Sequence, residues 1–383
     1  TIALLSPTRA EILSRAWALT DSTTATATLS YLPMAAFGWW VFLLSLVLFY
    51  NVVKNLCMDR KMLHRIVFVM IGIGLLEAFY GLIQALVPSM GVLWVDYVRD
   101  YLGTARGTFI NRNNFAGFIE MIWPLALGAT LAMTGRARSL KSALQSDSLN
   151  RQALMALGII VLLLALIFTR SRAGIVSGLI GFLVFAIMAR TGMKAVARQT
   201  RVLLGGIVVL LCVYLVTIGV DPILQRFLTI GGDGGSRMDI WRDSLPIIHD
   251  HPLGIGLRNY ENVFAVYNRS LTSDKTVLHA HNDFLQLLIE TGWIGFITII
   301  VGFFIFLWTH GRRIKQLDFQ MDPLRFFLAV GAFSGLISMT VHGLFDFNLQ
   351  IPANILYFVV LMAVLSACTQ PDGFHRRPAI PKP

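Results

Sequence analysis

The stretch HAHNDFLQLLIETGWIGFITIIVGFFIFLW, residues 279–308, joins a polar segment to an apolar one. Its second half is an unbroken apolar run. Written as one helix, the stretch from His281 to Trp308 is roughly 42 Å long, which exceeds the roughly 30 Å hydrocarbon thickness of a membrane. The stretch begins in the last residues of the one long polar part of the chain, residues 220–282. We therefore predict a helix whose first two turns stand in the headgroup region and whose remainder crosses the membrane.

Similar apolar runs recur along the whole chain. The sequence is 56% hydrophobic and only 14% charged, with a mean hydropathy of +0.67. A soluble protein of 383 residues needs more polar surface than this. The composition predicts an all-α, polytopic helical membrane protein with about nine spans. We place them at 33–53, 66–87, 113–134, 153–169, 173–189, 202–219, 285–308, 324–344 and 351–368.

The net charge of +11 follows the predicted topology. Lysines and arginines cluster in the short connections near residues 54–65, 136–151, 190–201 and 312–315, and in the C-terminal tail. If the spans alternate, all five clusters lie on one side, which the positive-inside rule makes cytoplasmic. The loops 88–112 and 220–282 then face outward. We expect contact with membrane lipid, and no nucleic acid as partner.

The predicted organisation has three parts. Residues 1–219 form an N-terminal bundle of about six spans, 220–282 an outward loop region, and 283–383 a bundle of about three spans with a cytoplasmic tail. Residues 1–32 have the composition of an outside segment, and we expect one or more spans to precede Thr1. Within the loop, residues 237–256 have the pattern of an amphipathic helix followed by a turn. We expect Trp241, Leu245 and Ile248 on that helix to rest on the membrane interface.

Polar residues at the start of the 279–308 stretch are the first candidates for chemistry. Neutral imidazole titrates near ambient pH, so an outward-facing His281 suits general-base catalysis. Asp283, Gln286 and Glu290 share one helical face and must face protein or water. The alternative is purely structural, with an acid that stabilises the first helical turn and a glutamate that pairs with an arginine.

A metal site is the other alternative for the histidines of the loop. His279 and His281 would form such a site with His249, Asp250 or His251. Scattered loop histidines without metal are commoner, and we predict neither a metal nor another cofactor.

Arginines form the second group of candidates. Arg170 and Arg172 interrupt the join between two predicted spans, and Arg237, Arg242 and Arg258 lie in the long loop. A guanidinium group matches phosphate oxygens with two parallel hydrogen bonds. The pattern predicts an anion site at the outer membrane surface, although a hairpin whose arginines reach the headgroups is the simpler alternative. We expect Glu77 and Glu120, inside two spans, to pair with such arginines.

His281-Asn282, nine residues, then Gly292-Trp293-Ile294-Gly295 form a pattern that resembles the H-[NSQ]-x9-G-x-x-G signature of the O-antigen ligase and O-antigen polymerase superfamily. The other matching stretches are Thr169 to Ala173 (T-x-S-R-G/A), Arg237 to Trp241 (R-x-x-x-W), His251 to Gly256 (P-L-x-G-x-G), GTFINRNNFAGF and FDFNLQIPAN. Ala173 stands where glycine is common. The resemblance covers residues 25–368.

The resemblance implies an inverting glycosyltransferase of the bacterial inner (cytoplasmic) membrane, whose active site faces the periplasm. Its donor would be a glycan on undecaprenyl diphosphate, and its acceptor a hydroxyl group of a glycan or of the lipid A core. Carried over by position, Arg172 and Arg237 would neutralise the donor diphosphate, and His281 would accept the acceptor's proton. The predicted substrate-binding residues are Arg170, Arg242, Arg258, His279, Asn282, Asp283 and Glu290.

Other activities stay open at this point. A repeat-unit polymerase of O-antigen or exopolysaccharide would use the same donor and leaving group. Transfer of glycan to protein hydroxyls would use the same type of motif. A transporter of lipid-linked oligosaccharide would also need outer arginines, but it is expected to carry charges through a central cavity. Here the polar groups gather at one face, which favours an enzyme.

Overall fold

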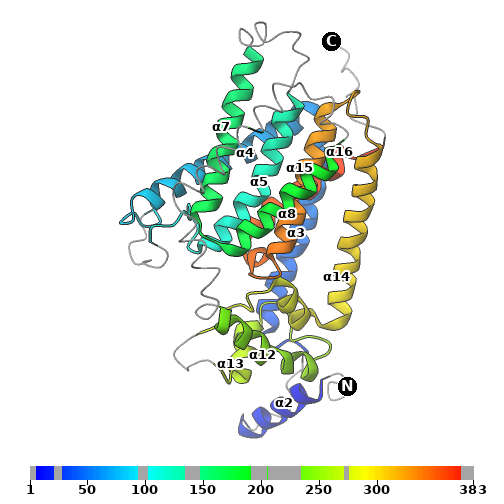
Figure 1. The fold of residues 1–383 in the computed structure, drawn as a ribbon. Helices are drawn as coiled ribbons and strands as arrows, with labels where there is room; N and C mark the ends of the chain where they lie inside the picture. Colours follow the sequence, from blue (N-terminus) through cyan, green and yellow to red (C-terminus); the bar gives the residue numbers. More distant parts are fainter. Residues whose placement is uncertain are drawn as a thin grey trace, which may run out of the picture. The chain divides into compact units, whose positions relative to one another are not determined.

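The computed structural model describes residues 6–20, 28–93, 102–133, 147–190, 205, 234–270 and 276–371. Every element of regular structure within these ranges is a helix, which confirms the all-α class (Figure 1). The chain divides into two compact units, which are described separately below. The predicted three-part division at residues 219 and 282 stays a prediction.

Helices occupy eight of the nine predicted spans. They are α3 (Pro33–Cys57), α4 (Arg60–Leu86), α5 (Arg112–Ala132), α7 (Asp147–Phe168), α8 (Arg172–Met188), α14 (Asp283–Gln316), α15 (Pro323–His342) and α16 (Pro352–Cys368). The ninth, 202–219, lies outside the described residues except for Gly205. In the described part of the chain, α3, α4, α5, α14 and α15 are long and apolar enough to cross a membrane. The apolar parts of α7, α8 and α16 are shorter, so the count of nine spans stays a prediction.

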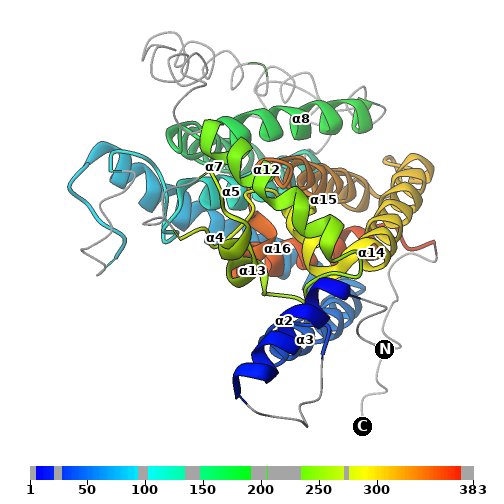
Figure 2. The ribbon, with the colours of Figure 1, turned by 90° about the horizontal axis from the view of Figure 1, so that it is seen from below.

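One unit comprises residues 48–228, 307–342 and 348–383. Its centre is α5, which is almost wholly buried and packs against α4, α7, α8, α15 and α16 (Figures 1 and 2). Glycines on α15 allow close contacts with α5. A Cβ atom at Gly335 would lie 2.7 Å from the carbonyl oxygen of Met121, and one at Gly331 would lie 2.6 Å from that of Pro124. Such contacts between small residues and backbone are typical of helix packing in membranes.

Small residues of α8 have the same role. A Cβ atom at Gly174 would lie 2.5 Å from the Cβ of Ala116, and one at Gly178 would lie 2.9 Å from Leu166. At Gly181 it would overlap the hydroxyl of Ser338. The expected packing function of these glycines is confirmed.

Acidic side chains inside this unit have other partners than expected. Glu120 is fully buried and binds Nδ1 of His342 at 3.1 Å and the hydroxyl of Ser177 at 2.6 Å. Glu77 accepts hydrogen bonds from the backbone N–H and the hydroxyl of Thr108, at 2.8 and 2.9 Å. The predicted pairing with arginines is therefore wrong. Polar partners on neighbouring elements satisfy these carboxyl groups at a lower desolvation cost than a buried guanidinium.

The second unit comprises residues 1–47, 229–306 and 343–347. It contains α2 (Pro7–Thr20), α12 (Gly234–Asp250) and α13 (Tyr260–Tyr267), together with residues 33–47 of α3 and residues 283–306 of α14. Helices α12 and α13 lie side by side (Figure 2). Their apolar core consists of Ile240, Ile247, Ile255, Tyr260, Val263, Phe264, Ala280 and Ile289. The predicted helix and turn over 237–256 are confirmed. Trp241 and Ile248 pack against this core and Leu245 is exposed, and their expected place on the membrane interface stays a prediction.

Helix α14 is interrupted at Gly292, where a continuous helix was expected. Gly292 has φ 66° and ψ −178°, a conformation that favours glycine. The segment after α12 packs against the interruption. Gly254, with φ 87°, lies so close that a Cβ atom there would be 2.5 Å from the nitrogen of Gly292. The backbone N–H of Gly256 donates to the carbonyl of Glu290 at 3.0 Å, and that of Trp293 to Pro252 at 3.0 Å. The P-L-x-G-x-G stretch at Gly254 and the G-x-x-G stretch at Gly292 are thus packed directly against each other.

Candidate active site

His281 precedes α14 and binds a buried carboxylate. Its Nδ1 atom lies 3.1 Å from Oδ1 of Asp346. The Asp346 side chain has no solvent exposure, whereas 29% of the His281 side chain is exposed. A carboxylate accepts the proton of Nδ1 and so fixes the tautomer in which Nε2 is the basic nitrogen. This pairing prepares His281 to accept a proton from a substrate.

Asp346 lies on the loop 343–347, and backbone contacts hold that loop against α14. The N–H of Asp283 donates to the carbonyls of Gly343 and Asp346, at 2.8 and 3.2 Å. The ring of Phe347 stacks on His279 at 4.3 Å between centroids and meets His281 edge-on at 4.9 Å. The carboxylate and the imidazole are therefore both fixed by their neighbours.

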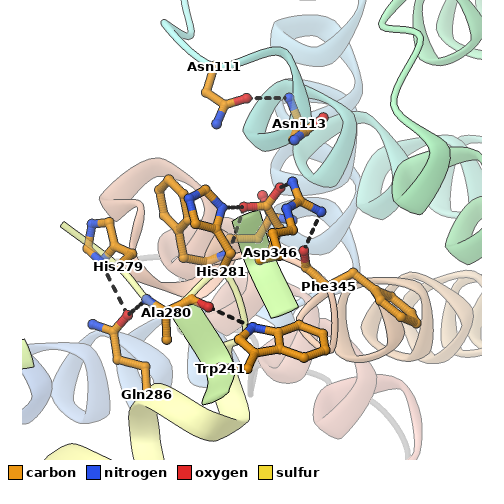
Figure 3. Close-up of polar contacts among 12 residues, drawn as sticks. Asn111, Asn113, Trp241, His279, Ala280, His281, Gln286, Phe345 and Asp346 are labelled. Atoms are coloured by element: carbon orange, nitrogen blue, oxygen red, sulfur yellow. Dashed lines mark hydrogen bonds and ion pairs between the residues drawn. The ribbon is translucent and has the colours of Figure 1, made fainter. Parts of the chain in front are cut away.

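Arg237 binds the other oxygen of the same carboxylate. Its Nη2 lies 3.3 Å from Oδ2 of Asp346, and its Nη1 donates to the carbonyl of Phe345 at 2.9 Å (Figure 3). One turn later on α12, the indole of Trp241 donates to the carbonyl of Ala280 at 2.9 Å. Residues four apart lie on one helical face, which explains the spacing of the R-x-x-x-W motif. Asp346 thus links Arg237 to His281.

His279, Gln286 and Glu290 form a second polar network beside His281. The amide oxygen of Gln286 accepts from the backbone N–H of Ala280 at 3.2 Å and lies 3.3 Å from Nδ1 of His279 (Figure 3). The amide nitrogen of Gln286 donates to Glu290 at 3.1 Å. Burial, aided by the charge of Arg258, lowers the pKa of His279 to about 4. His279 is therefore neutral at ordinary pH.

A cavity of about 110 Å³ opens next to this network. His279, Gln286 and Glu290 line it, together with Arg258 and Glu261. The guanidinium of Arg258 also lies over the ring of Trp39, 5.2 Å from its centroid. The structure therefore brings three predicted substrate-binding residues, Arg258, His279 and Glu290, to one cavity.

Left-handed backbone marks three of the candidate residues. His281, Arg258 and Arg170 have φ values of 50°, 63° and 53°. For a residue other than glycine this conformation costs about 1–2 kcal/mol. Such strain persists where the surroundings determine it strongly, and it clusters at functional sites.

The remaining candidates of this unit have other contacts. Asn282 caps α14, because its side-chain oxygen accepts from the backbone N–H groups of Phe284 and Leu285, both at 3.0 Å. Asp283 is buried in the first turn of the helix. Arg242 lies on the exposed face of α12 and pairs with Asp239 at 3.4 Å. Their predicted part in substrate binding stays a prediction.

Arg170 and Arg172 belong to the other unit, at the turn between α7 and α8. Thr169 and Ser171 build this turn. The Thr169 hydroxyl donates to the carbonyl of Leu166 at 2.6 Å and accepts from the N–H of Ser171 at 3.0 Å, and Ser171 caps α8. Arg170 is exposed and Arg172 is half-buried in the first turn of α8. The threonine and serine of the T-x-S-R segment thus shape the backbone that carries both arginines.

Comparison with known proteins adds the family. Residues 157–300, less than half of the chain, match the family model described as O-antigen ligase. The chain carries an O-antigen ligase domain. The resemblance inferred from the motifs is confirmed, and the matched segment contains Arg172, Arg237 and His281. No curated protein matches the chain.

The matched family consists of glycosyltransferase-like membrane enzymes, and the long apolar helices of this chain agree with a membrane protein. Asp346 and Phe347 lie beyond the matched segment of the O-antigen ligase domain, and the motif reading missed them as site residues. The FDFNLQIPAN stretch, which begins at Phe345, was the available signal. Among the described residues, there is no group of three or more histidine, cysteine or acidic side chains that could hold a metal ion.

Proposed function

We propose that this protein is an inverting glycosyltransferase of the O-antigen ligase type. It moves a glycan from an undecaprenyl-diphosphate carrier to an acceptor hydroxyl at the periplasmic face of the bacterial inner membrane. The observation that carries the proposal is the linked set of His281, Asp346 and Arg237 in a chain with an O-antigen ligase domain. This set offers a base and a cation close together, as attack on a sugar diphosphate requires.

The acceptor hydroxyl is the nucleophile, and His281 is its base. The oxygen attacks C1 of the donor sugar while its proton passes to Nε2 of His281. The imidazolium that forms is stabilised by the Asp346 carboxylate at 3.1 Å. A single displacement on the face opposite the leaving group inverts the configuration at C1.

The leaving group is undecaprenyl diphosphate. The bond between C1 and the phosphate oxygen breaks, and its electron pair stays on the diphosphate. Cations near that oxygen stabilise the charge that develops there. Arg237 is proposed for this task, because it is partly exposed and hydrogen-bonded by fixed partners. Arg172 is proposed as a second diphosphate ligand on the strength of the T-x-S-R segment.

The first test is the surface glycan of the source bacterium. In a deletion strain that carries His281→Ala, Arg237→Ala or Arg172→Ala, surface glycan is expected to be absent while the protein still inserts into the membrane. His64→Ala and Arg15→Ala, two changes outside the proposed site, serve as matched controls with normal glycan. Wild-type glycan in all three site variants would reject the assignment.

The glycan profile of the deletion strain also distinguishes ligase activity from polymerase activity. Lipid A core that carries a single repeat indicates a lost polymerase. Bare core, with long chains retained on the lipid carrier, indicates a lost ligase. A transporter is separated by its product, because an enzyme releases polyprenyl diphosphate from the glycan and a transporter leaves that bond intact.

A further inference from the structure

The cavity beside His279 has a polar lining that the proposed reaction does not yet use. Its volume is about 110 Å³, and a single water molecule needs only about 10–15 Å³ of such space. Arg258 and Glu261 stand at the exposed side, and Gln286 and Glu290 are buried. The cavity therefore has room for a group larger than one water, with charged side chains around it.

The hydrogen-bond network decides which atoms serve as donors and which as acceptors. A backbone N–H is always a donor, so the N–H of Ala280 requires the amide oxygen of Gln286 to face it. The same oxygen then accepts from Nδ1 of His279, and the amide nitrogen donates to Glu290. Neutral His279 consequently carries its proton on Nδ1, and its Nε2 is an acceptor.

Glu290 supplies a second acceptor. Its carboxylate receives the amide of Gln286 and the backbone N–H groups of Arg258 and Tyr260. The two side-chain oxygens offer about four positions for hydrogen bonds, so about one position is left after these three donors. Arg258 contributes a guanidinium with up to five N–H donors on the same cavity.

The balance of charge selects the kind of ligand. Two acidic side chains, Glu261 and Glu290, line the cavity with one guanidinium, Arg258, while His279 is neutral. The single cation is thus matched by acidic groups, and the lining has no excess of positive charge with which to bind a diphosphate. Sugar hydroxyl groups are neutral and both donate and accept, which matches this mixture of donors and acceptors. The proximity to the proposed base fits as well, because the rings of His279 and His281 both contact Phe347.

We propose that this cavity is a carbohydrate subsite, which binds hydroxyl groups of a sugar next to the catalytic base. The proposal rests on the proposed function and adds to it a place for the neutral part of the substrate, separate from the diphosphate. Two sugars can supply these hydroxyls, the acceptor residue and the donor residue nearest the carrier.

Binding is tested apart from catalysis. The full chain, with His281→Ala to prevent turnover, is placed in lipid nanodiscs and titrated with oligosaccharide released by mild acid from the source bacterium's surface glycan. Isothermal titration calorimetry reports occupancy. Glu290→Gln is expected to weaken binding about tenfold or more, because an amide nitrogen, which only donates, replaces one of the oxygens that can accept from a sugar hydroxyl. Leu278→Trp fills the cavity from its exposed rim without touching the buried network and is expected to do the same.

A control variant and a kinetic experiment complete the test. Glu11→Gln, an exposed carboxylate on α2, should bind as the parent does. Failure of the parent to bind, or unchanged affinity in both cavity variants, overturns the subsite. The two cavity variants are also made in protein that keeps His281, and their KM values are compared with those of wild type. A raised KM for acceptor alone assigns the subsite to the acceptor sugar, and a raised KM for donor alone assigns it to the donor sugar. Transfer activity that survives His281→Ala would instead refute the proposed function, while the binding result still stands.

Discussion

Replacement of Asp346 by asparagine tests the link between base and cation. The change keeps the shape of the side chain and removes its charge. The backbone N–H of Phe347 donates to Oδ1 at 3.0 Å, which requires an oxygen at that position in the variant as well. The new amide nitrogen must then face the guanidinium of Arg237, where two donors meet. His281 keeps its tautomer but loses the negative charge beside it.

The expected magnitude follows from these two losses. A hydrogen bond to a charged group contributes about 1.5–3 kcal/mol and a neutral one about 0.5–1.5 kcal/mol, so the weaker support of the imidazolium costs about 1–1.5 kcal/mol. The donor–donor conflict at Arg237 costs a similar amount. Together these losses of about 2–3 kcal/mol predict a transfer rate about 30- to 160-fold lower in Asp346→Asn.

The assay is the initial rate of glycan transfer from a polyprenyl-diphosphate donor by purified protein. Asp318→Asn, a change at an exposed carboxylate, should leave the rate unchanged. Thermal denaturation in the same detergent separates a lost charge from a lost fold. A rate within twofold of wild type for Asp346→Asn, with His281→Ala inactive, would refute the view that this carboxylate supports the base.

Two further predictions concern stability. Gly292→Ala should destabilise the protein by at least about 2 kcal/mol, because alanine disfavours φ 66° and its Cβ would overlap the backbone at Leu253. Gly302→Ala in the same helix, where a Cβ atom has open space, is the matched control and should be neutral or slightly stabilising in thermal denaturation. Burial holds the pKa of His279 at about 4, below its usual 6.5, so the unfolded chain binds the proton first and stability falls as pH drops from 6.5 toward 4. The loss from this residue is at most about 3 kcal/mol, and a melting temperature as pH-dependent in His279→Gln as in wild type would contradict it.

The sequence predicted the helices well, because each apolar run is long and its period does not depend on distant residues. Helix positions were predicted from local pattern alone, and the histidine-to-glycine signature was found through its resemblance to a known family. The break at Gly292 was not. Its cause is the contact with Gly254, which lies 38 residues earlier in the chain, and no local pattern reports such a contact.

The partners of the acidic residues also could not be predicted from local pattern, because they lie far away in the sequence. Glu120 was expected to pair with an arginine because opposite charges attract, yet in the folded chain it meets His342, 222 residues away. Asp346 lies 65 residues from His281 and was noticed only within a family-like stretch. Spacing predicts which residues share a helical face, but it does not predict which loop a distant helix brings beside them.

The nine-residue spacing in the H-[NSQ]-x9-G-x-x-G signature follows from the contacts that hold His281 and Gly292 in place. His281 is tied to Asp346, and Gly292 is packed against Leu253 and Gly254. The nine residues after Asn282 form the rigid helical rod between these two attachments. One inserted residue would rotate one end against the other by about 100° and lengthen the rod by about 1.5 Å. Either the imidazole would leave its carboxylate or the glycine would lose its packing, so the number nine is a mechanical requirement of the site.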